Sequence, residues 1–184
     1  FGASVAAWCA LLRPDIFRAV ALMSAPFGGV PAIPLGGPPP PAPDIHATLA
    51  ALERPRKHYQ WYYSGRAANE DMWHPPQGLH AFLRGYYHYK SADWPGNRPF
   101  PLSGWTAGEL ANLPTYYIMD RDQGMAATVA AEMPAKPDCP WLSDAELAVY
   151  AGEYARTGFQ GGLQWYRCRT EARFQPELQV FGGR

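Results

Sequence analysis

Tyrosine is the side chain in this sequence best suited to acid chemistry at neutral pH. The chain has 11 Tyr and 7 Trp. A phenol with an ordinary pKa of about 10 stays protonated at neutral pH and can donate to a developing alkoxide. An indole N–H also donates a hydrogen bond but cannot act as an acid. Most tyrosines pack or lie at the surface, so this composition predicts an apolar, aromatic pocket and singles out no catalytic residue.

Other side chains that could do chemistry are poorly spaced for it. The three cysteines, at 9, 139 and 168, are too few and too far apart for a disulfide framework or a zinc site. His58, His74, His80 and His88 do not fall at metal-ligand spacing and are interpreted as surface or structural residues. Two loop acids, at 120 and 122, resemble a calcium pair only superficially. We therefore expect no metal.

Charge and hydropathy exclude two further classes of function. The formal net charge is +0, and no stretch gathers Lys and Arg into a basic stripe, so we expect no nucleic-acid partner. The apolar run Ala19–Met23 is far shorter than the roughly 20 residues of a membrane span. No signal peptide is visible, although a signal before Phe1 would lie outside this sequence. We expect a reduced, cytoplasmic protein.

The first 27 residues have the pattern of one α/β unit. Phe1–Leu12 is apolar on nearly every side, which predicts a buried helix on a sheet. Val20–Met23 is a short continuous apolar run, which predicts a strand of a parallel sheet buried on both faces. One such unit cannot form a domain, and the remaining sequence does not supply its sheet neighbours.

The rest of the chain is predicted to be mainly helical. Residues 28–45 are rich in Pro and Gly and predict a hinge, of which Pro38–Pro41 could alternatively be a polyproline ligand. Helical patterns follow over residues 45–68 (interrupted at Pro55), 77–90, 143–158 and 163–174, with capping-box patterns at Thr106 and Ser143. Tyr116–Met119 is ambiguous between strand and loop, and residues 177–183 could approach a strand of the core. The predicted division is core fragment 1–27, hinge 28–45, helical domain 46–175 and a return toward the core over 176–184.

Three segments resemble the epoxide hydrolases of the α/β-hydrolase superfamily. Phe1 to Ala10 resembles the second half of a nucleophile elbow and its helix, with Gly2 as the closing glycine. The pair Tyr59-Gln60 resembles a Tyr-Gln pair on one cap helix of that family. Gly158-Phe159-Gln160-Gly161-Gly162-Leu163-Gln164-Trp165-Tyr166-Arg167 matches every fixed position of a second cap signature, Gly-Phe-x-Gly-x-Leu-x-Trp-Tyr-Arg. The fold class implied is α/β, a partial α/β-hydrolase core with a helical cap.

The resemblance implies roles for particular residues. Tyr59 and Tyr166 would face each other with both hydroxyls aimed at the oxygen of a small apolar or aryl epoxide. The backbone N–H of Phe1 would stabilise an oxyanion, next to an aspartate nucleophile before it. The relay acid and histidine would follow Arg184. Substrate-binding residues would be Gln60, Tyr63, Phe27 and Trp165. The mechanism requires no cofactor, and a homodimer through the cap is a hypothesis.

Three alternatives remain open at this point. A dehalogenase of the same fold would expel a halide, which needs only N–H donors such as Trp61 and Trp165. An esterase would need Ser before Phe1. The chain could also be a non-catalytic binding module, but then Trp8 and Leu12 would be left exposed. The tyrosine pair favours epoxide opening, because a strongly basic alkoxide needs a proton donor and a halide does not.

Overall fold

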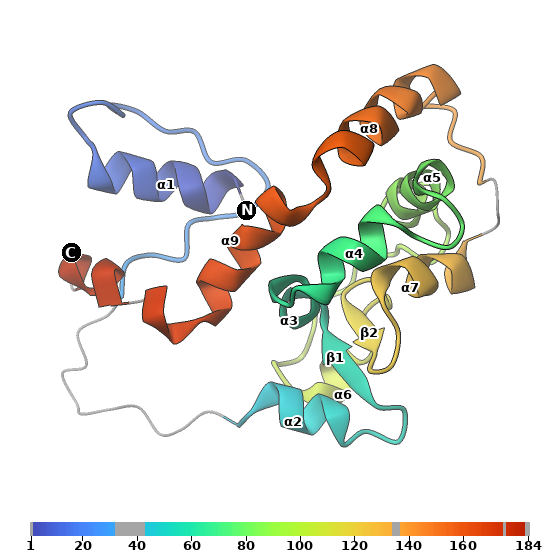
Figure 1. Cartoon of the computed structure of the whole chain (residues 1–184). Coiled ribbons are helices and arrows are strands. Elements are labelled where there is room, and N and C mark those ends of the chain that lie inside the picture. The colour runs from blue at the N-terminus through green and yellow to red at the C-terminus, as the bar shows by residue number, and fades with distance from the viewer. Residues whose placement is uncertain (1, 32–42, 134–136, 175, 183–184) are drawn as a thin grey trace. The chain divides into compact units, whose positions relative to one another are not determined.

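The computed structural model describes residues 2–31, 43–133, 137–174 and 176–182, and it is mainly helical (Figure 1). The chain divides into two compact units, Phe1–Pro40 with Glu171–Arg184 and Pro41–Thr170, and each is described by itself. The elements are α1 (Gly2–Leu12), α2 (Ile45–Ala50), β1 (Arg56–His58), α3 (Tyr59–Ser64), α4 (Ala67–Trp73), α5 (Leu79–Tyr89), α6 (Ala107–Leu110), β2 (Ile118–Asp120), α7 (Met125–Glu132), α8 (Asp144–Thr157), α9 (Gln160–Thr170) and the 3-10 helices η1 (Ala172–Phe174) and η2 (Pro176–Phe181).

The first unit contains the predicted N-terminal helix but not the predicted strand. Helix α1 is confirmed as a helix, but the prediction that it is buried on a sheet is wrong: Ala7 is its one buried residue and Leu12 is 52% exposed. Trp8 packs edge-on against Phe27 at a ring-centroid distance of 5.4 Å and against Phe181 at 5.9 Å. The prediction of a parallel strand at Val20–Met23 is wrong, because these residues have no strand pairing and Met23 is 80% exposed. A strand forms only with a neighbour to complete its ladder, and the described residues of this chain supply none there.

The chain end also differs from one expectation. Residues of the segment 177–183 were expected to approach a strand, but up to Phe181 they belong to the 3-10 helix η2. Gly183 lies outside the described residues, as do residues 32–42 of the predicted hinge.

The second unit has one small antiparallel sheet that the sequence pattern did not predict in full. β1 pairs with β2 in the register Arg56↔Asp120 and His58↔Ile118. Residues 45–68 were predicted to be helical, and this prediction is wrong at β1. The charged sequence of β1, Arg-Lys-His, has no alternating apolar pattern that would have predicted a strand. Buried Arg56 instead bonds the Ile118 carbonyl at 3.1 Å and the Asp120 carboxylate at 3.0 Å across the sheet. Leu49 of α2 packs with Ile118 and the α6 residue Leu110 in a small core.

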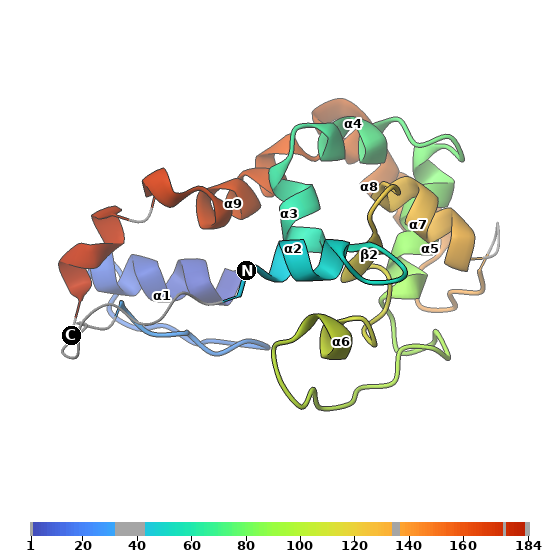
Figure 2. The same cartoon turned by 90° about the horizontal axis from the view of Figure 1, so that it is seen from below.

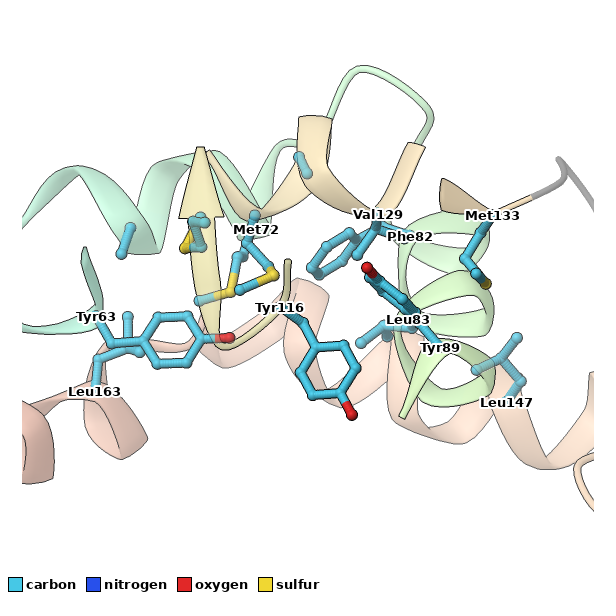
Figure 3. Packing of buried hydrophobic residues seen from close by; sticks show 14 of the residues in the cluster. Tyr63, Met72, Phe82, Leu83, Tyr89, Tyr116, Val129, Met133, Leu147 and Leu163 are labelled. Carbon is cyan, nitrogen blue, oxygen red and sulfur yellow. The ribbon is translucent and has the colours of Figure 1, made fainter. Parts of the chain in front are cut away.

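A larger apolar core joins the longer helices of this unit. Helix α5 packs against α7 and α8, and the three lie together in both views (Figure 1 and Figure 2). Tyr63 and Leu163 lie at one end of the cluster and Met133 and Leu147 at the other (Figure 3). Gly85 lets α5 approach α7 closely, since a Cβ there would lie 2.8 Å from Cγ1 of Val129.

Helix ends follow local chemistry where the sequence carries clear caps. The predicted capping box at Ser143 is confirmed, with Glu146 as its reciprocal partner. At Thr106 the box is only half formed: its side chain accepts from the Glu109 backbone N–H, but the Glu109 carboxylate accepts from the Ser103 N–H at 2.9 Å. The amphipathic helix predicted over 77–90 is confirmed as α5. No helix among the described residues is both long and apolar enough to cross a membrane.

Candidate active site

Tyr59 is the first residue of α3, and two interactions hold it there. Its backbone N–H donates to the Tyr117 carbonyl at 2.8 Å, which ties the start of the helix to the segment before β2. The preceding residue, His58, is the N-cap, and its ring Nδ1 accepts from the Gln60 N–H at 3.3 Å. Burial lowers the pKa of His58 to about 4, so the ring is neutral at neutral pH and its Nδ1 can accept this bond.

Tyr166 lies on α9, which packs against α3. Helix α9 begins after Gly158, whose φ of 63° is a left-handed conformation that glycine adopts without strain. The Asn69 side-chain oxygen accepts from the Phe159 N–H at 2.9 Å, so it caps the start of α9 from a distant helix. Buried Leu163 anchors the helix in the core one turn before Tyr166.

Helix α4 fixes three of its neighbours through side chains on alternate residues. Asn69 caps the start of α9, as above. Asp71 accepts from the Ala126 N–H at 3.1 Å in the first turn of α7, and also from the Tyr62 hydroxyl. Trp73 donates its indole N–H to the Ala155 carbonyl at 3.0 Å near the end of α8. One short helix thereby sets where three others begin or end.

These elements bring the two predicted tyrosines into contact. The rings of Tyr59 and Tyr166 meet nearly edge to face, with centroids 5.8 Å apart and planes at 75°. Tyr63 contacts both, at 5.6 Å from Tyr59 and 5.0 Å from Tyr166. The hydroxyls of Tyr63 and Tyr86 share a hydrogen bond of 2.9 Å. The sequence signatures, about a hundred residues apart, thus lie on one aromatic cluster.

Burial keeps two phenols of the cluster protonated. Burial, and then the neighbouring Tyr59, raise the pKa of Tyr166 to about 12, so Tyr166 is a neutral phenol throughout the neutral pH range. Burial likewise raises the pKa of Tyr63 well above its ordinary value. The Gln60 amide donates to the Tyr59 hydroxyl oxygen at 3.2 Å, which leaves the hydroxyl proton of Tyr59 available to another acceptor.

Lys90 is a cluster residue that sequence reasoning missed. It caps the end of α5, and its ammonium lies 6.0 Å from the ring centroid of Tyr59 and 5.0 Å from that of Tyr86. It also lies 4.6 Å and 5.2 Å from the rings of Tyr116 and Tyr117. A lysine at the end of an amphipathic helix is ordinarily solvated, so only its tertiary surroundings distinguish it.

The remaining predicted site residues are placed differently. Phe27 belongs to the first unit and contacts Trp8. Trp165 is half-buried and directly precedes Tyr166, so its side chain leaves α9 roughly 100° around the axis from that tyrosine. Phe1 lies outside the described residues. The substrate-binding roles of Gln60, Tyr63, Phe27 and Trp165 stay predictions, as does the role of the Phe1 N–H.

Comparison with known proteins gives a short sequence match and a long structural one. No protein-family model matches the chain. The solved structure "Epoxide hydrolase from an endophytic Streptomyces" superposes with a TM-score of 0.64 over 98% of this chain, at 23% sequence identity. The chain therefore has the fold of part of an epoxide hydrolase. The predicted α/β-hydrolase class is supported in that coarse form, with a mainly helical structure and a single described sheet of two strands.

The sequence match names the same kind of enzyme. "Epoxide hydrolase A" of Mycobacterium tuberculosis (strain ATCC 25618 / H37Rv) is 63% identical to this chain over 27 residues, 15% of the chain. The resemblance to epoxide hydrolases inferred from the motifs is thus confirmed. The match covers 8% of that relative's length, and the chain covers 45% of the Streptomyces structure.

Proposed function

We propose that this chain is the tyrosine-bearing part of an epoxide hydrolase, in which Tyr59 and Tyr166 act on the epoxide oxygen. The observation that carries the proposal is the direct contact of these two side chains, from α3 and α9. The two comparisons, both with proteins named epoxide hydrolase, support it.

The proposed reaction has two steps. An aspartate before Phe1 attacks an epoxide carbon, the carbon–oxygen bond breaks, and its electron pair moves to the ring oxygen. One tyrosine gives its proton to that oxygen while the other holds it by a hydrogen bond. Water then adds to the ester carbonyl carbon and gives one proton to a histidine held by its acid partner, with the Phe1 N–H stabilising the oxyanion. The ester C–O bond breaks as the leaving alcohol oxygen takes that proton from the histidine, and the second proton of the water returns through solvent to the tyrosinate, which restores the aspartate and the phenol. The product is a vicinal diol.

The protonation states fit the first step. A neutral phenol is needed at the start, and burial keeps Tyr166 protonated, with a pKa of about 12. The Gln60 donation to the Tyr59 oxygen favours the phenolate that remains when Tyr59 has given up its proton. Neither group needs a metal ion or an organic cofactor for this role.

The halide alternative would use the indole N–H groups of Trp61 and Trp165, and the described ring contacts bear on Trp61. Trp61 is 50% exposed and stacks on His46, with ring centroids 3.5 Å apart. That stacking turns the Trp61 ring to a partner outside the tyrosine cluster. A halide site would instead need an indole N–H that points at the halogen as it leaves the carbon.

The proposal is tested by assaying the whole protein with an aryl epoxide and a haloalkane in parallel. We expect diol release, and a loss of about 10² or more in kcat for Tyr166→Phe and for Tyr59→Phe, because each removes only a hydroxyl. Tyr150→Phe, at a half-exposed position on α8, is the matched control and should retain full activity. Halide release that ignores both substitutions would contradict the proposal.

A further inference from the structure

The ammonium of Lys90 sits among aromatic rings from three parts of the second unit. Tyr59 comes from α3, Tyr86 from α5, and Tyr116 and Tyr117 from the segment that enters β2. All four ring centroids lie 4.6 to 6.0 Å from Nζ, the range in which a cation is attracted to a ring face. The end of α5 adds a favourable helix dipole, since cations are stabilised at helix C-termini.

No carboxylate pairs with Lys90 among the contacts of the described residues. Burial alone lowers its pKa to about 8, with no charged neighbour contributing. The groups that face it are phenols: burial raises the pKa of Tyr116 to about 12 and also raises those of Tyr86 and Tyr117. These three therefore remain neutral while Lys90 titrates, so its charge is not compensated.

We infer that Lys90 is a positioning residue of the proposed site, whose positive charge favours the phenolate formed when Tyr59 gives its proton to the opening epoxide. The inference rests on the proposed function. In that step the Tyr59 O–H bond breaks, the product alcohol O–H bond forms, and the negative charge stays on the Tyr59 oxygen. The Lys90 ammonium lies 6.0 Å from the centroid of the Tyr59 ring, and a positive charge near an acid favours the ionised form of that acid.

A merely structural Lys90 would hold the rings together without changing their acidity. Two substitutions separate the roles. Lys90→Arg keeps a charge that does not titrate, and Lys90→Met keeps the length and apolar stem but removes the charge. Lys57→Met is the matched control, because Lys57 also lies over a tyrosine ring, that of Tyr62 at 5.1 Å, and the described cation–π contacts include none between Lys57 and Tyr59. Near-ultraviolet circular dichroism checks that each variant keeps its aromatic packing.

The first measurement needs no substrate. The Tyr59 phenol is titrated by carbon NMR in protein with ring-labelled tyrosine, and its resonance is identified by its loss in Tyr59→Phe. We expect the pKa of Tyr59 to be lower in Lys90→Arg than in Lys90→Met by about one unit or more. Equal values in the two variants would overturn the inference.

The second measurement is the pH dependence of kcat/KM for diol formation. In the wild type we expect the rate to fall as the pH rises through about 8, where Lys90 loses its charge. Lys90→Arg should keep its rate to higher pH, and Lys90→Met should be about tenfold slower with no fall near that pH. A Lys90→Met profile that matches the wild type and Lys57→Met would overturn the inference. If no epoxide is hydrolysed, the proposed function fails, and the Tyr59 titration still decides the role of Lys90.

Discussion

At the scale of single residues, the hydrogen bond from Gln60 to Tyr59 sets the direction in which Tyr59 can donate. The amide nitrogen donates to the phenol oxygen at 3.2 Å, so the phenol proton is not used within this pair. A carboxylate at position 60 would reverse the bond, because it can only accept. Whether the side chain at position 60 donates or accepts a hydrogen bond therefore decides whether Tyr59 is free to act as an acid.

Gln60→Glu is expected to lower kcat/KM for diol formation by about tenfold, since the new carboxylate would compete for the phenol proton through a charge-assisted bond of about 1.5 kcal/mol. Gln60→Leu removes the amide without adding an acceptor and should cost less. Steady-state kinetics on the whole protein distinguish the two variants. Equal losses would show that position 60 matters only for packing.

His58 gives the fold a dependence on pH. Its pKa is lowered to about 4 by burial first and by His46 second, against an ordinary value of 6.5. Between these values the unfolded chain binds a proton that the folded chain does not. The free energy of unfolding should therefore fall as the pH drops through this window, and the contribution is fully present above 6.5.

His58→Asn tests this, because Asn can cap α3 but does not titrate. From about pH 7 to about pH 5 the wild type should lose about 2 kcal/mol more unfolding free energy than the variant. Urea unfolding at the two pH values provides the measurement. An identical loss in both proteins would mean that protonation of His58 is not linked to folding.

At the scale of elements, the site depends on how α4 holds its neighbours. The Asn69 side chain caps α9, and α9 carries Tyr166. We expect Asn69→Ala to lose about 1 kcal/mol of stability and to lower kcat, because Tyr166 would no longer be held against Tyr59. Asn112→Ala is the control, since the Asn112 side chain makes no hydrogen bond among the described contacts. Unchanged kcat in Asn69→Ala would show that the cap does not position Tyr166.

The close approach of Asp71 to Gly124 offers a second test at this scale. A Cβ at position 124 would clash with the Asp71 carboxylate, which is held by the Ala126 N–H. Gly124→Ala should therefore cost about 1 to 3 kcal/mol through overpacking and loss of that bond. In an Asp71→Ala background the same substitution should cost much less. Additive losses in the double-mutant cycle would contradict the proposed clash.

Elements with local signals were predictable, and those that depend on distant partners were not. Ser143 with Glu146, and Gly158 beyond them, mark both ends of α8 in the sequence itself. The apolar run Val20–Met23 has strand composition, but a strand needs a ladder partner. β1 is the opposite case. Its charged sequence does not predict a strand, and it forms one through contacts with β2, such as the bond from Arg56 to Asp120, more than sixty residues away.

The candidate site was predictable to the extent that it lies in the two signatures. Tyr59 and Tyr166 were named from sequence resemblance, and the fold brings their rings together. Lys90 was not predictable, because nothing in its own helix reveals that Tyr116 and Tyr117 will surround it. Charge and composition describe a residue's own preferences, while the fold determines which side chains face it.

At the scale of the whole molecule, the two units differ in how well they are packed. The second unit has a continuous core that includes Phe82, Met119 and Leu147. In the first unit, Leu12 is 52% exposed and Phe17 is 45% exposed, although both are large apolar side chains. Few apolar contacts therefore stabilise the first unit by itself.

Hydrogen exchange on the 184-residue chain should therefore show slow, cooperative protection within Pro41–Thr170 and rapid exchange in α1. Protection reports local unfolding free energy, which is low where apolar contacts are few. Mass spectrometry of peptic fragments would resolve the two units. Equal protection of both, lost together on addition of urea, would contradict this expectation.

The central claim is that Tyr59 and Tyr166 assist ring opening and not the later hydrolysis of the ester. Single-turnover mixing of the whole protein with an aryl epoxide measures the rate of alkyl-enzyme formation separately from its breakdown. We predict that Tyr59→Phe and Tyr166→Phe each slow formation by about 10² or more and leave breakdown nearly unchanged. Formation at the wild-type rate in the double variant would contradict the claim.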